Sequence, residues 1–182
     1  MGLASSIVRG VFGIDSGLVG GATTFVEPAA AAIAGVWVGQ LAPRRATILG
    51  AAAVAAGASL IVVAVLTANL PAMVIGGVIG GVGFGASFSG ALRSMAPLAG
   101  PHQRAGLFAA VYLVGYLLFG VPVILAGLLI TPLGLTTTVA GYGAAIVITA
   151  AAGLLAQSRG PFGRRDRDIM TAAIYDRHMV AP

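Results

Sequence analysis

The chain has 182 residues, of which 58% are hydrophobic and only 8% are charged. A soluble domain usually carries about 25% charged residues, so we expect lipid, rather than water, to cover most of this protein. The net charge of +5 comes from arginines in short connections and in the tail, which is typical of the positive-inside rule and not of nucleic-acid binding. The absence of cysteine excludes a disulfide framework and thiolate chemistry.

A short N-terminal segment over residues 1–15 precedes five apolar segments. These segments cover about residues 16–41, 46–67, 71–89, 105–131 and 135–156. Each is long enough for the roughly 20 residues that a bilayer core requires. We therefore predict an all-α polytopic integral membrane protein with about five transmembrane helices over residues 16–157, followed by a basic cytoplasmic tail over residues 158–182.

Two carboxylates fall in or beside the first apolar segment. Glu27 lies inside the segment and is followed by Pro28. An acidic side chain within a membrane span is costly and usually functional, for example in a proton relay, so Glu27 is the main candidate for proton-coupled transport. The alternative is a protonated glutamate that hydrogen-bonds to a neighbouring helix without a role in transport. Asp15 is the second candidate, although its place at the start of the segment also suits a helix-start residue.

The third segment contains a glycine-rich run over residues 74–88. Glycine recurs at every fourth position, at Gly77, Gly81 and Gly85. Small residues at this spacing predict a helix face for close helix packing. The run lacks the Gly-Lys-Ser/Thr ending of a phosphate loop. The residues that follow are candidates for lining a cavity: Ser87, Phe88 and Ser89. For the two serines the alternative is a bond to the carbonyl four residues earlier.

The arginines alternate with the apolar segments. Arg44 and Arg45 follow the first segment, Arg93 and Arg104 follow the third, and the remaining basic cluster follows the fifth, whereas the opposite turns carry no charge. The positive-inside rule therefore predicts a cytoplasmic C-terminus in what we expect to be a bacterial plasma membrane. These four arginines are candidates for cytoplasmic anchoring or gating. Arg9 opposes this assignment, because it would lie outside.

Three stretches together resemble a known family. They are Gly39–Ala46, with its paired arginines, the glycine run through Arg93, and Arg104–Gly127, which includes Pro122 as a helix-bending or packing residue. In order and spacing they are similar to helices 8–12 of a major facilitator superfamily transporter, within its C-terminal half. The resemblance implies solute transport by rocking of helix bundles. It departs from the family at Pro43, where the loop motif usually carries aspartate.

The resemblance also implies that helices are missing. The family's first half and its seventh helix have no counterpart, so we expect a truncated transporter, a split-transporter subunit or a misassigned start, completed by a missing N-terminal half or a second copy. The alternative function is a non-transporting membrane scaffold, an interaction subunit or an inactive remnant. No catalytic or metal-binding constellation accompanies His102 or His178, so we expect neither an enzyme nor a cofactor. The solute itself is not identified by these residues.

Overall fold

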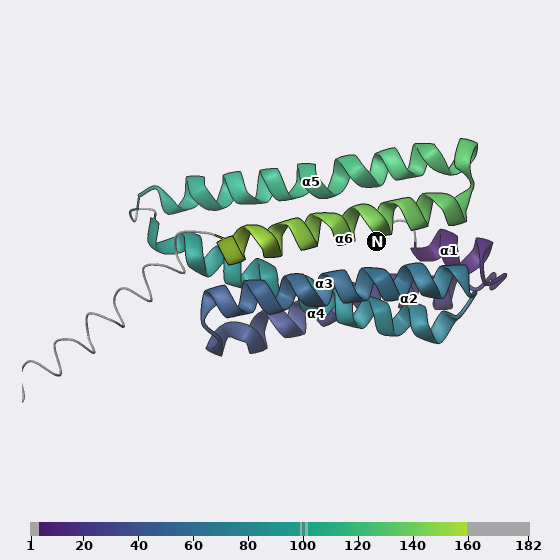
Figure 1. The fold of residues 1–182 in the computed structure, drawn as a ribbon, viewed down its shortest axis with the longest axis horizontal. Helices are drawn as coiled ribbons and strands as arrows, with labels where there is room; N and C mark the ends of the chain where they lie inside the picture. The colour runs from purple at the N-terminus through teal and green to yellow at the C-terminus, as the bar shows by residue number, and fades with distance from the viewer. Residues whose placement is uncertain (1–3, 99, 101, 160–182) are drawn as a thin grey trace, which may run out of the picture.

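The protein is described by a computed structural model that covers residues 4–98, 100 and 102–159. The described residues form helices and connecting turns (Figure 1). Five helices are long and apolar enough to cross a membrane, which confirms the predicted all-α architecture with five candidate spans. The expected tail falls largely outside the described residues.

The elements are α1 (Ala4–Gly10), α2 (Gly17–Trp37), the 3₁₀ turn η1 (Val38–Gln40), α3 (Pro43–Leu66), α4 (Leu70–Met95), the 3₁₀ turn η2 (Ala96–Leu98), α5 (Arg104–Leu133) and α6 (Leu135–Arg159).

Several helix ends differ from the boundaries expected from sequence, and two of them have a clear physical reason. The helix α4 continues past Ser89 to Met95, and Gly90 packs within it against the Pro43 carbonyl of α3. This glycine therefore serves a helix contact and does not end the helix. The helix α5 continues through Pro132, and only Gly134 separates it from α6. Gly134 has a φ of +80°, a conformation that glycine adopts without the steric cost of a side chain.

The helix α4 lies between α2 and α3 and packs most extensively against α3. The helix α6 packs on α3, and α5 lies at the edge of the bundle beside α6 (Figure 1). The short helix α1, which the sequence did not predict, covers one end of this arrangement. Its Ile7 joins the buried cluster formed by Ala64, Val65, Met73 and Val139. The helix α1 thus belongs to the packed structure.

One glycine face of α4 meets α2. A Cβ atom added at Gly81 would overlap the carbonyl oxygen of Glu27, and one added at Gly85 would overlap that of Ala31. At Gly77 the nearest atom to such a Cβ is a methyl group of Val26 at 3.9 Å, which is an ordinary contact. The two backbones therefore approach most closely at Gly81 and Gly85 and diverge towards Gly77.

A second glycine face of α4 meets α3. A Cβ atom added at Gly57 of α3 would overlap the backbone nitrogen of Gly80. A Cβ atom added at Gly83 would lie only 2.6 Å from the Gly50 carbonyl oxygen. The doubled glycines of the run therefore place small residues on two sides of α4, so that both neighbours approach its backbone.

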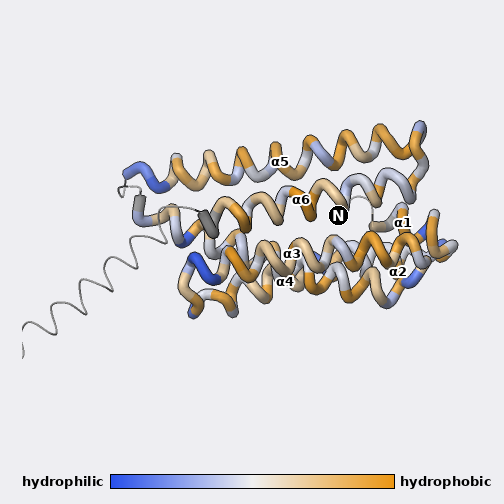
Figure 2. Tube along the Cα trace, viewed as in Figure 1, coloured by the Kyte–Doolittle hydropathy of each residue, from blue (hydrophilic) through white to orange (hydrophobic). Residues whose placement is uncertain are grey.

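The membrane-spanning helices satisfy their polar groups internally. Thr24 donates its hydroxyl to the Gly20 carbonyl at 2.7 Å, and Thr138 donates to the Gly134 carbonyl at 2.8 Å. Outward-facing surfaces carry large apolar side chains such as Leu118 and Leu128 of α5. Figure 2 shows hydrophobic residues along much of each long helix and hydrophilic stretches at helix ends. This pattern suits hydrocarbon, in which an unsatisfied polar group is costly.

We expect Gly85→Ala to destabilise the fold, because its methyl group would meet the Ala31 backbone, which cannot move aside as a side chain can. Overpacking of this kind costs about 1–3 kcal/mol. Gly77→Ala is the matched control and should unfold like the parent protein. Thermal unfolding in detergent, followed by Trp37 fluorescence, measures both variants. Equal unfolding temperatures for the two variants would contradict the close approach at Gly85.

Candidate functional site

The side chain of Arg93, in the last turn of α4, bonds to four backbone carbonyls. Its Nη1 donates to the carbonyls of Gly39 at 2.9 Å and Leu41 at 2.8 Å, and its Nη2 donates to Val38 at 3.1 Å. Its Nε donates to the Ser89 carbonyl at 3.3 Å. Four of the five guanidinium N–H groups are thus used, and three of them bond to carbonyls of the connection between α2 and α3, where Val38 also accepts the Leu41 backbone N–H. We call this contact the Arg93 clamp.

The Arg93 clamp lies among other basic side chains. Arg44 and Arg45 open α3 and Arg104 opens α5, and all three are exposed. We call these three and Arg93 the arginine end. The carboxylates in the described part of the chain are Asp15, before α2, and Glu27, midway along it. Within that part, neither carboxylate forms an ion pair with Arg93.

A groove of about 420 Å³ runs between α2 and α4 and reaches Arg93. Small residues of α2 leave this space open, and the rings of Phe84 and Phe88 form part of its wall. Phe88 and Ser89, two of the residues expected to line a cavity, both lie on it. Its polar side chains are Ser89 and Arg93, and the full lining is Ala31, Ala32, Gly35, Val36, Phe84, Gly85, Phe88, Ser89, Leu92 and Arg93.

Ser87, the third residue expected at a cavity, points elsewhere. Its hydroxyl donates to the Thr47 carbonyl of α3 at 3.4 Å, and it is not part of the groove lining. This bond differs from both alternatives that the sequence offered, since it joins two helices instead of closing on the same helix. It was not predictable from α4 alone, because its acceptor belongs to another segment.

Aromatic rings connect α4 to the loosely packed α5. Phe84 and Phe88 of α4 stack with ring centroids 5.7 Å apart. Phe119 meets the edge of Phe84 at 5.2 Å, and Tyr112 meets Phe88 at 5.8 Å. Edge-to-face pairs add about 0.5–1.5 kcal/mol beyond the area that they bury. The rings therefore join the wall of the groove to a helix in which Ala126 is the buried residue.

Glu27 occupies the middle of α2, ten residues after Gly17 and ten before Trp37. It is half-buried and lies seven residues from both Gly20 and Ala34, the buried residues of α2, so it shares their inward face. The phenol of Tyr142 in α6 lies within electrostatic range of its carboxyl group. Within the described residues, no hydrogen bond or ion pair holds this carboxyl group. The structure therefore places an acidic side chain on the inner face of a span.

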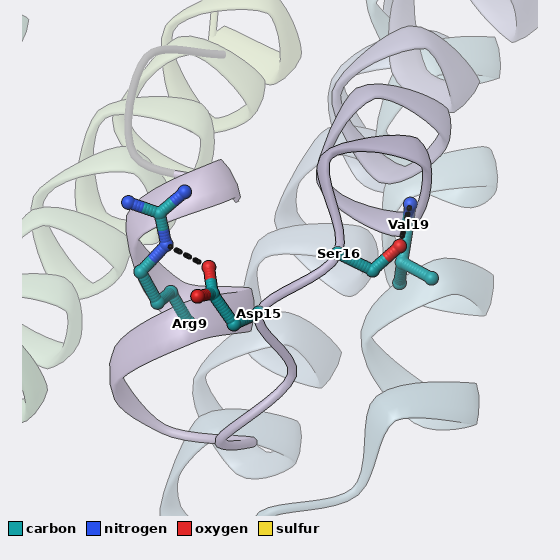
Figure 3. A network of polar contacts seen from close by, with 4 residues as sticks. All are labelled: Arg9, Asp15, Ser16 and Val19. Carbon is teal, nitrogen blue, oxygen red and sulfur yellow. Dashed lines mark hydrogen bonds and ion pairs between the residues drawn. The ribbon is translucent and has the colours of Figure 1, made fainter.

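Asp15 lies outside the helices, where its Oδ1 pairs with the Nε of Arg9 at 3.1 Å (Figure 3). Both side chains are largely exposed. The adjacent Ser16, and not Asp15, caps α2 by accepting a bond from the Val19 backbone N–H at 3.5 Å (Figure 3). Arg9, which opposes the charge asymmetry inferred from sequence, therefore lies at the end of the bundle away from Arg93.

Sequence reasoning did not single out Tyr142, Phe84 or Phe119. Tyr142 carries a polar group within an apolar segment, a signal that could have been used, whereas the pairing of the rings depends on tertiary structure. The described residues contain no group of three or more His, Cys, Asp or Glu side chains that could hold a metal ion. Comparison of the chain with models of protein families, with curated proteins and with solved structures found no match.

We expect Arg93→Gln to lower the free energy of unfolding by about 2–3 kcal/mol, because hydrogen bonds from a charged donor are lost and the acceptors remain. Arg93→Lys should recover part of this loss, since an ammonium group cannot match the planar fork of a guanidinium. Arg45→Gln is the control for charge at an exposed position. Trp37 fluorescence during thermal unfolding measures the unfolding temperatures of the three variants. Unfolding of Arg93→Gln at the same temperature as Arg45→Gln would show that the clamp is not stabilising.

Proposed function

We propose that this chain is a transport unit that moves a small solute across a membrane, with Glu27 as its proton-binding group. The observation that carries this proposal is the position of Glu27, midway along α2 and on its inward face. At a rise of 1.5 Å per residue, the carboxyl group lies about 15 Å from either end of the helix. Acidic side chains at such depth usually mark ion pathways or proton relays.

Protonation of Glu27 changes the charge inside the bundle. An ionised carboxylate in an apolar interior needs compensating hydrogen-bond donors. The Tyr142 phenol, close enough to sense the carboxylate, is a suitable donor from another helix. Proton binding and release at Glu27 can therefore bias the arrangement of α2 relative to α6, which is the kind of coupling that a proton-driven transporter requires.

The contacts around α4 suggest which parts move together. Gly81 and Gly85 hold α2 against α4 by close backbone approach, and the Arg93 clamp ties the same two helices at one end. By contrast, α5 contacts α4 mainly through aromatic rings. We propose that α2, α3 and α4 rock as one body relative to α5 in an alternating-access cycle, with α6, which packs on α3, lying between that body and α5.

The sequence resemblance to helices 8–12 of a major facilitator transporter supports the same class of function. In that family, solute binds between two helix bundles, so a second copy of this chain or a separate chain would supply the other side. A non-transporting scaffold is the second candidate, and one observation favours it. The helix α5 has Ala126 as its buried residue, which leaves most of its apolar surface for lipid or a partner helix.

We also propose that the arginine end faces the cytoplasm of a bacterial plasma membrane. Arg44, Arg45, Arg93 and Arg104 lie at this end, whereas Arg9 at the other end is paired with Asp15. Basic residues near span ends are retained on the cytoplasmic side.

In proteoliposomes tested with a panel of solutes, wild-type protein is expected to give solute-dependent currents that vary with pH. Glu27→Gln should remove the pH dependence of the current, because an amide, unlike a carboxyl group, does not bind or release a proton. Glu27→Asp should retain the pH dependence. Electrical recording on supported proteoliposomes measures both. Full pH dependence in Glu27→Gln would exclude Glu27 as the coupling group, and wild-type protein without any solute-dependent current would favour the scaffold.

Orientation can be measured cleanly, because the chain has no cysteine. We expect a membrane-impermeant maleimide added to intact bacterial cells to label Thr67→Cys, between α3 and α4, and to spare His102→Cys, before α5. Both positions are exposed. His102→Cys should react after the membrane is permeabilised. The reverse pattern in intact cells would place the arginine end outside.

A further inference from the structure

The α2–α4 groove combines an apolar wall with one cationic end. Its sides consist of alanine, glycine, valine, leucine and phenylalanine, and its polar side chains are Ser89 and Arg93. The guanidinium of Arg93 bonds to four carbonyls, which are uncharged, so these bonds leave its positive charge uncompensated. One of its five N–H groups is not used by these bonds. A ligand that fits both features has an apolar chain and an anionic group.

We propose that this groove binds an anionic phospholipid, with one acyl chain along α2 and α4 and the phosphate at Arg93. The binding is separate from the proposed transport of solute and does not depend on it. The groove is open along its length and lies between two candidate spans, so lipid can enter from the bilayer. The acyl chain would contact the small residues of α2, such as Ala32 and Gly35.

Charge complementarity selects an anionic over a zwitterionic headgroup. Arg45 is exposed near the start of α3, at the same end of the bundle as Arg93. Both described carboxylates lie elsewhere, since Asp15 precedes α2 and Glu27 lies midway along it. An anionic headgroup at Arg93 and Arg45 therefore meets two cations, and neither of the described carboxylates forms an ion pair with them. Attraction of one basic residue to an anionic lipid corresponds to about a fivefold change in affinity.

The protein carries its own reporter for this site. Trp37 is the single tryptophan of the chain, follows the groove residue Val36 and is 80% exposed. Brominated lipids quench tryptophan on contact. In bilayers that mix phosphatidylglycerol and phosphatidylcholine with matched acyl chains, brominating one lipid at a time gives the ratio of the two lipids beside Trp37. We expect phosphatidylglycerol to be enriched about fivefold over its bulk share.

Two pairs of variants separate charge from shape. Arg93→Gln should lower the enrichment about fivefold, whereas Arg93→Lys should retain it, because it keeps the charge although it disrupts the clamp. Ala32→Leu should also lower the enrichment, since its side chain fills the groove without touching the headgroup end. Ala22→Leu, on an exposed part of α2 outside the groove, is the control and should behave like the parent protein.

Each alternative result overturns a stated part of the proposal. Equal quenching by the two lipids in wild-type protein would exclude an anionic lipid site. Enrichment that survives Arg93→Gln would remove Arg93 as the headgroup contact. Enrichment that survives Ala32→Leu would reduce the site to general attraction of lipid to a basic surface, without an acyl chain in the groove. Complete competition by glycerol 3-phosphate, which lacks acyl chains, would likewise exclude the groove.

Discussion

The close approach of two backbones to α4 is the constraint on which the rest of the bundle depends. In lipid, apolar side chains gain little by leaving their surroundings, so helices associate through packing and polar contacts. The glycines of α4 allow α2 to approach at Gly81 and Gly85, and α3 to approach at Gly80 and Gly83. Each interior glycine weakens a helix in water by about 1 kcal/mol. In a bilayer that effect is offset, because the backbone must remain helical to satisfy its hydrogen bonds.

The Arg93 clamp supplies a polar counterpart to this packing. The α2–α3 connection presents carbonyl groups at one end of the bundle, and the Arg93 guanidinium of α4 donates to three of them. The same side chain therefore fixes the loop, closes one end of the α2–α4 groove and retains a positive charge there. The glycine packing and the hydrogen bonds of the Arg93 clamp both join α2 to α4. These two helices therefore move as one rigid body in the proposed transport cycle.

Glu27 and Tyr142, unlike the glycines and Arg93, do not join closely packed helices. They come from α2 and α6, helices that are not extensively packed on each other, and they bring polar groups into the interior of the bundle. Such groups are costly in an apolar medium unless they find partners. Their placement is therefore a local departure from what stability alone requires. A departure of this kind is expected at a functional position.

The sequence by itself determined the class of the protein, because hydropathy and length leave a bilayer as the only suitable solvent for five such segments. It also marked Glu27, the glycine run and the alternating arginines, each of which is a local signal. Tertiary structure decided which glycine meets which neighbour, that Arg93 binds the α2–α3 connection, that Ser87 bonds to α3 and that Asp15 pairs with Arg9. These depend on contacts between residues far apart in the chain or on turn geometry, and no periodicity within a single segment encodes them.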